Sequence, residues 1–322
     1  MNFWRTSASP NWLHTWERIL IPGYLRYTPE KEPRLAGYEP VRALPVHGKE
    51  LTEFWNLFYR GKDWRMDLSL EHVQSYLDDK RVYVYILIEH QRIVASIVST
   101  PCPLVMSHGA TLSNARIIEG LVVHPYLRNK GIAGLMISYM DYVTSKLSPV
   151  CHLWAREELM PSFFSTAVSC QSYSYICPEH VLRGTMPIER LAWSDFIQLK
   201  EWKRTDGHWI RSSGLFQRRG DLDVWWGKTK PHVVVVVANT RRVETKTNKP
   251  IHEIVWCSDK PQEGLLESIA LKYKGPLFTT LSPKLLSPEW TKGKSGYHSW
   301  YIYNYLPPAF GNCTVELIRE EL

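Results

Sequence analysis

The sequence predicts a mixed α/β protein (α+β, with a mixed sheet) that is built from two related halves. Apolar residues at helical spacing alternate with short apolar strands along the 322 residues of the chain. The order of helix, hairpin, helix and closing strands occurs twice. The length also suits two domains, because one domain commonly takes about 100 to 200 residues.

The first half starts with an arm that is rich in proline. Six prolines in residues 1–45 fix backbone angles and remove hydrogen-bond donors, so we expect this arm to run in extended form over the body. The body then shows two amphipathic helices, of which the second is capped by Ser69, followed by a hairpin, a third strand and a further helix. The predicted ranges are 51–58, 70–77 and 131–146 for helices and 82–88, 93–100, 117–123 and 150–155 for strands.

The second half repeats this order more faintly. Its predicted helices lie at 191–202 and 265–269, and its predicted strands lie at 233–238, 251–257, 277–280, 300–305 and 314–318. A basic loop at 241–249 joins the first two of these strands into a hairpin. We therefore expect an arm over residues 1–45, a first folded domain over 46–185 and a second over 186–322.

Composition argues against several classes of partner. The 39 basic and 32 acidic residues give a net charge of +7, which favours anionic ligands, but the basic residues are scattered and we expect no nucleic acid partner. The six cysteines lack metal-type pairing, so we expect reduced thiols and no metal. We find no signal peptide, and no apolar run approaches the roughly 18 residues of a membrane span. We therefore expect a cytoplasmic monomer.

Residues 117–134 carry the strongest functional signal. An apolar strand ends in Val-Val-His-Pro, passes through a basic turn and leads into a helix. Main-chain N–H groups at a helix start lack an intrahelical partner and carry the positive end of the helix dipole. Gly131 and Ala133 let a ligand approach these groups, and Arg128 and Lys130 add positive charge, as in a diphosphate-binding turn. The alternative is an ordinary turn whose basic residues are only solvated.

The spacing Arg-x-x-Gly-x-Ala at 128–133 resembles the acyl-CoA site of the GNAT superfamily of N-acyltransferases. Four further segments, in order along the chain, resemble eukaryotic N-myristoyltransferase, a tandem-GNAT enzyme. They are Asn2–Thr6, Trp64–His72, Ile97–Pro101 and Gly296–Tyr305. The resemblance implies tandem GNAT-like folds, with the acyl-CoA site in 46–185 and a degenerate fold in 186–322. It implies acyl-CoA, as myristoyl-CoA or acetyl-CoA, as co-substrate, and a protein or peptide N-terminus or another amine as acceptor.

The resemblance also assigns individual residues. The CoA contacts that it implies are Phe3, Trp4, Leu121, Val122, Val123, Arg128, Asn129, Lys130, Gly131, Ile132 and Ala133. It further implies that the main-chain N–H groups of Gly120 and Leu121 form an oxyanion hole. The chain departs from the family at two positions near the acceptor amine. Glu119 stands where the family has asparagine, and Trp154-Ala-Arg156 stands where it has Thr-Ala-Gly.

These departures leave the base open. Glu119 is the first candidate, because half-burial on a strand favours the protonated carboxyl and suits a general base near neutral pH. A structural ion pair with Arg116 or Arg156 is its alternative role. The family uses its terminal carboxylate, so Glu320 and the carboxylate of Leu322 are fallback bases. Two other functions also stay open, a small-acyl GNAT N-acetyltransferase and a catalytically inactive protein that binds CoA.

Overall fold

The computed structural model describes two units. Unit 1 comprises Met1–Arg156, Met160–Val168 and Ser299–Val315, and unit 2 comprises Glu157–Leu159, Ser169–His298 and Glu316–Leu322. Within them, the described residues to which every structural statement below refers are 23–24, 31–35, 37–101, 104–106, 111–112, 114–146, 151–156, 166–175, 186–192, 194–195, 221–230, 232–259, 261–273, 277–279, 290–303, 305–306 and 315–317.

The sheet of unit 1 has the strand order β2-β4-β5-β8-β9. Its strands are β2 (Val41–Arg42), β4 (Tyr83–Glu89), β5 (Arg92–Pro101), β8 (Ala115–Val123) and β9 (Cys151–Arg156). The end of β16 (Trp290–Tyr303) pairs with β9 through Ser299 to Tyr303. All neighbours are antiparallel except β8 and β9, which run parallel. The β4–β5 hairpin turns at His90 and Gln91, whose φ angles of 49° and 62° suit a two-residue type I′ turn.

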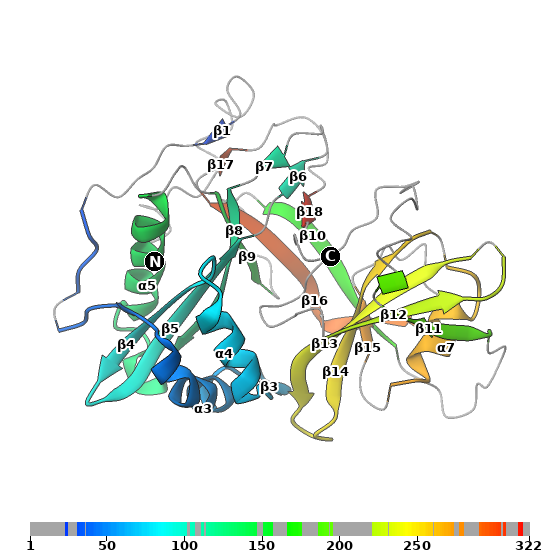
Figure 1. Cartoon of the computed structure of the whole chain (residues 1–322), viewed down its shortest axis with the longest axis horizontal. Coiled ribbons are helices and arrows are strands. Elements are labelled where there is room, and N and C mark those ends of the chain that lie inside the picture. Colours follow the sequence, from blue (N-terminus) through cyan, green and yellow to red (C-terminus); the bar gives the residue numbers. More distant parts are fainter. Residues whose placement is uncertain are drawn as a thin grey trace. The chain divides into compact units, whose positions relative to one another are not determined.

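Helices cover both faces of this sheet (Figure 1). They are α3 (Gly48–Phe58), α4 (Leu70–Asp78) and α5 (Ile132–Ser145). Successive side chains of a strand point to opposite faces. Ala95 and Ile97 of β5 pack in one cluster with α5, whereas Ser96 between them meets Trp55 of α3. The predicted cap of α4 is present, because Ser69 Oγ accepts a hydrogen bond from the N–H of His72 at 3.2 Å.

The sheet of unit 2 has the order β11-β12-β13-β14-β15-β10. Its elements are β10 (Thr166–Tyr175), β11 (Ile188–Leu191), β12 (Leu222–Gly227), β13 (Val234–Glu244), β14 (Pro250–Cys257), α7 (Leu265–Ala270) and β15 (Leu277–Thr279). The strands are antiparallel except β14 and β15, which run parallel with α7 between them in the chain. Valines of β13 and the buried face of α7 form the core of this unit.

The two units repeat one arrangement. In each, a hairpin is followed by an antiparallel strand, a crossover helix and a strand parallel to the one before the helix. In unit 1 these elements are the hairpin β4–β5, then β8, α5 and β9. In unit 2 they are the hairpin β12–β13, then β14, α7 and β15. Both crossover helices start after a glycine with a φ of +82°, Gly131 or Gly264. The strand before each helix carries a β-bulge. In each unit the strand beyond the parallel pair comes from a distant part of the sequence, β16 for β9 and β10 for β15.

Several short elements complete the described chain. They are β1 (Gly23–Tyr24), β3 (Trp64–Met66), β6 (Leu104–Met106), β7 (Thr111–Leu112), β17 (Tyr305–Leu306), β18 (Val315–Leu317) and the 3-10 turns η2 (Pro45–His47) and η3 (Pro125–Leu127). None of the helices in the described ranges combines the length and the apolar composition needed to cross a bilayer.

Two predicted elements of the second half need correction. Leu191, the expected start of a helix, ends the strand β11, and most of the predicted helix at 191–202 lies outside the described residues. The predicted basic loop at 241–249 is shorter, because β13 continues to Glu244 and the turn is confined to 245–247. The strand is longer because its pairing with β14 resumes beyond a register shift, through Arg242–Ile251 and Val243–Pro250. Within that shift, the Nε of Arg241 donates to the buried carboxylate of Asp221 at 2.6 Å.

Cys257 is the one cysteine whose thiol the structure describes, and it is free and buried. Burial raises its pKa from 9.0 to about 12, and its Sγ donates to the carbonyl oxygen of Asp259 at 2.9 Å. We therefore expect iodoacetamide at pH 8 to alkylate Cys257 at least about 100-fold more slowly in the native protein than in urea. Because the unfolded thiol loses its proton first, the free energy of unfolding should also fall as pH rises from about 9 to 12. Peptide mapping after timed alkylation checks the first result, and rapid native labelling would contradict it.

Candidate functional site

A β-bulge interrupts β8 at the position of the predicted oxyanion hole. The register of β5 and β8 shifts between Ser96 and Val98, so that one residue of β5 faces two residues of β8, Gly120 and Leu121. Gly120 has a φ of +55°, which glycine adopts without steric cost and which one class of β-bulge uses. The bulge therefore depends on the residue type at this position.

β8 and β9 part just before this bulge. Their parallel pairing ends at Ile117 and Leu153, although β8 runs on to Val123 and β9 to Arg156. β9 keeps its antiparallel partner β16 as far as Arg156. Within the described residues, the main chain of β8 at the bulge therefore has no strand partner on its β9 side.

The peptide between Gly120 and Leu121 has a defined orientation. The hydroxyl of Ser96 on β5 donates to the carbonyl oxygen of Gly120 at 2.9 Å, so this carbonyl points toward β5. In a trans peptide the C=O and the next N–H point in opposite directions. The N–H of Leu121 consequently points away from β5, toward the side on which β9 has parted. A fixed N–H on an open side of a strand is what an oxyanion donor requires.

Glu119 precedes the bulge on the face of the sheet opposite to α5. Ile118 packs in the α5 cluster, and residues alternate along a strand, so Glu119 faces the other way. Its Oε2 atom is buried. Arg116, one of its predicted partners, donates instead to the hydroxyl and carbonyl of Ser99 and to the carbonyl of Arg81, at 2.6 to 2.8 Å. Burial lowers the pKa of Arg116 to about 10.

The turn at 128–131 leads into α5 without a side-chain cap. Asn129 and Gly131 have φ angles of 64° and 82°, in the left-handed region. The first turn of α5 carries neither a capping side chain nor an acidic residue. A Cβ built on Gly131 would meet nothing within 4 Å, so the approach is open. The N–H groups and the positive end of the helix dipole are therefore arranged as an anion site would need them.

The two basic side chains of this turn, Arg128 and Lys130, each contact a neighbouring residue. The Nε of Arg128 donates to the carbonyl of Val123 at 3.2 Å, which ties the turn to the end of β8. The Nζ of Lys130 lies 5.8 Å from the ring centre of Tyr126. The hydroxyl of Tyr126 donates to Glu89 at the end of β4, and this hydrogen bond raises the pKa of Tyr126 to about 12. The predicted diphosphate turn is thus braced against the β4–β5 hairpin.

The corresponding helix start in unit 2 has a different charge. The residues before α7 are Pro261, Gln262, Glu263 and Gly264, without a lysine or arginine, and the first turn of α7 contains Glu267. The bulge of β14 falls at Val255 and not at a glycine. The backbone pattern is repeated, but of the four residues directly before each helix, basic residues occur before α5 and not before α7.

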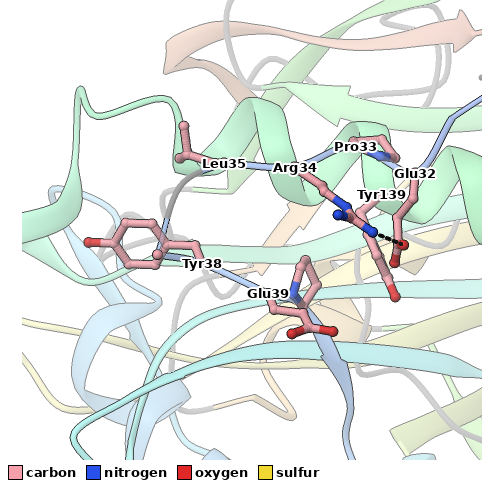
Figure 2. A pocket seen from close by; sticks show the side chains of 9 residues that line it. Glu32, Pro33, Arg34, Leu35, Tyr38, Glu39 and Tyr139 are labelled. Atoms are coloured by element: carbon pink, nitrogen blue, oxygen red, sulfur yellow. Dashed lines mark ion pairs between the residues drawn. The ribbon is translucent and has the colours of Figure 1, made fainter.

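A separate pocket lies between the arm and α5, with a volume of about 480 Å³. Its lining residues are Glu32, Pro33, Arg34, Leu35, Gly37, Tyr38, Glu39, Pro40 and Tyr139. Figure 2 shows the ion pair between Arg34 and Glu32, with 3.6 Å between Nη2 and Oε2, beside Tyr139. Burial, Tyr85 and the two glutamates raise the pKa of Tyr139. None of the predicted site residues lines this pocket.

A buried polar cluster joins α5 to β9. Thr144 Oγ1 lies 3.1 Å from His152 Nε2, and His152 Nδ1 lies 3.4 Å from Asp141 Oδ1. These residue types also form nucleophile, base and carboxylate triads. All three residues are buried, with at most 3% of each exposed, so substrate has no access. The cluster is a structural tie between the helix and the strand.

The structure brings the predicted residues 119–123 and 128–133 together at the end of β8 and the start of α5. Val122 and Ile132 are buried, which leaves only their main chain for a ligand. Phe3, Trp4, Glu320 and Leu322 lie outside the described residues. Sequence reasoning missed the hydrogen-bonded support of the site, which consists of Trp55, Glu89, Ser96 and Tyr126. Polar serines inside the apolar strand at 93–100 were the available signal.

Comparison with known proteins gives a consistent picture of the fold. No protein-family model matches the sequence. No curated protein matches it either. A solved structure of N-myristoyltransferase from Saccharomyces cerevisiae with bound myristoyl-CoA superposes with a TM-score of 0.70, at 13% identity, and covers 99% of each chain. Two further structures of that yeast enzyme have TM-scores of 0.67 and 0.65 at 14% identity, and cover 95% and 96% of this chain and 89% and 91% of theirs.

These superpositions extend over nearly the whole chain, whereas the identity is too low to transfer an activity. They agree with the repeated strand and helix order of the two units. The predicted fold class and the resemblance are therefore confirmed at the level of the fold: the chain has a tandem GNAT-like fold that resembles the fold of N-myristoyltransferase.

Proposed function

We propose that the chain is an acyl-CoA-dependent N-acyltransferase of the GNAT/N-myristoyltransferase type, which moves an acyl group from CoA to the N-terminal amine of a protein or peptide. One observation supports this above all. A bulge whose peptide directs an N–H to the open side of β8 is followed along the chain by a basic turn and an uncapped helix start. Carbonyl polarisation and diphosphate binding are thereby available along one short segment.

In the proposed reaction, the amine nitrogen of the acceptor bonds to the thioester carbonyl carbon and the C–S bond breaks. The amine proton passes to a base and CoA leaves as its thiolate. The N–H groups of Gly120 and Leu121 stabilise the oxyanion that forms. Bound acyl-CoA would supply the thioester, and residues 128–133, with the end of β8 and the arm residues Phe3 and Trp4, would hold it.

Calorimetric titration with acetyl-CoA and with myristoyl-CoA tests this proposal. We expect at least one of them to bind, and the preferred chain length separates a myristoyltransferase from a small-acyl N-acetyltransferase. If neither binds, the proposal is wrong. Binding without turnover of a library of peptides with free N-termini would identify a CoA-binding protein that has lost catalysis. The changes at Glu119 and Arg156, beside the expected amine, make that second outcome informative.

Replacing Glu119 by glutamine should lower turnover by about 100-fold or more if this carboxylate is the base, because general base catalysis commonly contributes that much. The affinity for acyl-CoA should stay unchanged, since Glu119 lies on the face of the sheet away from α5. Steady-state rates and calorimetry measure the two effects. Glu253→Gln is the matched control, because Glu253 is a buried carboxylate two residues before the bulge of β14. Unchanged turnover in Glu119→Gln would show that Glu119 is not the base, and Glu320 and the Leu322 carboxylate would then be the remaining candidates.

A further inference from the structure

We infer that Trp55 and Ser96 are positioning residues that hold the Leu121 N–H in the orientation needed to stabilise the oxyanion, an inference that rests on the proposed function. Both residues are fully buried, and neither was singled out by the sequence motifs. Together they form a hydrogen-bond chain from α3 through β5 to the bulge of β8.

The direction of this chain follows from its chemistry. The indole Nε1–H of Trp55 lies 2.8 Å from Ser96 Oγ, and an indole N–H can only donate. Ser96 Oγ therefore accepts from Trp55 and has one proton left to donate. That proton goes to the carbonyl oxygen of Gly120 at 2.9 Å. The hydroxyl is thus committed to a single rotamer, and the Gly120 carbonyl receives a fixed donor.

The bulge needs such a donor more than a regular strand would. Gly120 has the widest conformational freedom of any residue type, and the pairing with β9 has ended before it. Only a fixed carbonyl keeps the following N–H pointing to the open side, since the two are antiparallel in one peptide plane. Without the hydroxyl of Ser96, the peptide of Gly120 and Leu121 would be free to rotate, and the oxyanion donor would be misaligned.

α3 places the indole that starts this chain. Glu50 in the first turn of α3 accepts a hydrogen bond from the N–H of Ile93 at 2.7 Å, which fixes the helix against the start of β5. Trp55 then lies five residues further along α3 and reaches Ser96, three residues after Ile93. Both ends of the Trp55–Ser96 hydrogen bond are therefore on elements that are tied to each other.

Ser96→Ala tests the inference, with Ser99→Ala as the matched control. Ser99 is an equally buried serine on β5, but its hydroxyl accepts from Arg116 and does not meet the bulge. We expect Ser96→Ala to lower kcat by about 10- to 100-fold while the Kd for acetyl-CoA or myristoyl-CoA stays within about twofold. Ser99→Ala should leave kcat within about twofold of the parent. Ser96→Thr keeps the hydroxyl and should restore most of kcat.

Two spectroscopic measurements report on the peptide itself. Labelling glycine with ¹³C at the carbonyl and leucine with ¹⁵N leaves four Gly–Leu amides, at Gly120, Gly134, Gly214 and Gly264. In the free protein, the Gly120–Leu121 signal should shift in Ser96→Ala and not in Ser99→Ala. With ¹³C-labelled thioester bound and no acceptor, the infrared carbonyl stretch should lie at lower frequency in the parent than in Ser96→Ala, because a misaligned donor polarises the carbonyl less.

The possible failures are distinguishable. If the parent binds neither CoA thioester, the proposed function is wrong and the catalytic role of Ser96 falls with it. If the parent binds and turns over, but Ser96→Ala changes neither the carbonyl stretch nor kcat, only the positioning role is overturned. Equal losses of kcat in Ser96→Ala and Ser99→Ala would also overturn it, because they would indicate a general effect of removing a buried hydroxyl.

Discussion

Replacing Gly131 by aspartate should abolish acyl-CoA binding, with a loss of affinity of at least about 100-fold, while the protein stays folded. The new carboxylate would lie at the start of α5, where the positive end of the helix dipole is expected to receive the diphosphate. The Cβ has open space, and aspartate tolerates the left-handed conformation better than most residues. We therefore expect the free energy of unfolding to change by less than about 2 kcal/mol. Calorimetric titration and chemical denaturation measure the two quantities.

Gly264→Asp provides a control with nearly the same backbone. Gly264 precedes α7 with φ and ψ angles of 82° and −7°, against 82° and −1° for Gly131 before α5. The same strain and the same added charge should therefore appear at both helix starts, but only Gly131→Asp should weaken acyl-CoA binding. Equal affinity of the two variants for acyl-CoA would show that the start of α5 does not bind the diphosphate.

Replacing Gly120 by valine should lower kcat by about 100-fold or more with little change in acyl-CoA affinity. A β-branched residue strongly disfavours the φ of +55° that Gly120 adopts, so the bulge would have to rearrange. The N–H of Leu121 would then leave its orientation toward the open side of β8, and loss of one oxyanion donor commonly costs about 100- to 1,000-fold in kcat. Single-turnover rates at saturating acyl-CoA measure this loss.

Gly37→Val separates backbone strain from catalysis. Gly37 has a φ of +82° with open space around an added Cβ, and it lies in the arm and not on β8. We expect it to lower stability in the way that Gly120→Val does, by about 1 to 3 kcal/mol, without lowering kcat. A kcat for Gly120→Val that matches the parent would show that the bulge peptide takes no part in the reaction.

Local chemistry made the framework of unit 1 predictable. Ser69 caps α4, apolar spacing defines α3 and α5, and Gly131 marks the turn before α5. These signals act over a few residues and can be read from the sequence. The bulge could not be predicted in this way, because it is a shift in the pairing of two strands. A single glycine such as Gly120 does not predict such a shift.

The support of the site depends on contacts between distant residues. Ser96 and Gly120 are 24 residues apart, and Trp55 and Ser96 are 41 apart. The contact of Arg241 with Asp221, 20 residues earlier, is of the same long-range kind. No spacing rule links such pairs. The resemblance to N-myristoyltransferase supplied the location of the oxyanion hole, but only the three-dimensional contacts identify what orients it.

The distant origin of the strand that pairs with β9 has a consequence for synthesis of the protein. β9 is complete early in translation, yet its antiparallel neighbour, the end of β16, leaves the ribosome only after almost all of unit 2. Until then the outer backbone groups of β9 are an unpaired edge, which is prone to bind other chains. The sheet of unit 1 therefore cannot be completed until the end of β16 has been synthesised, after nearly all of unit 2.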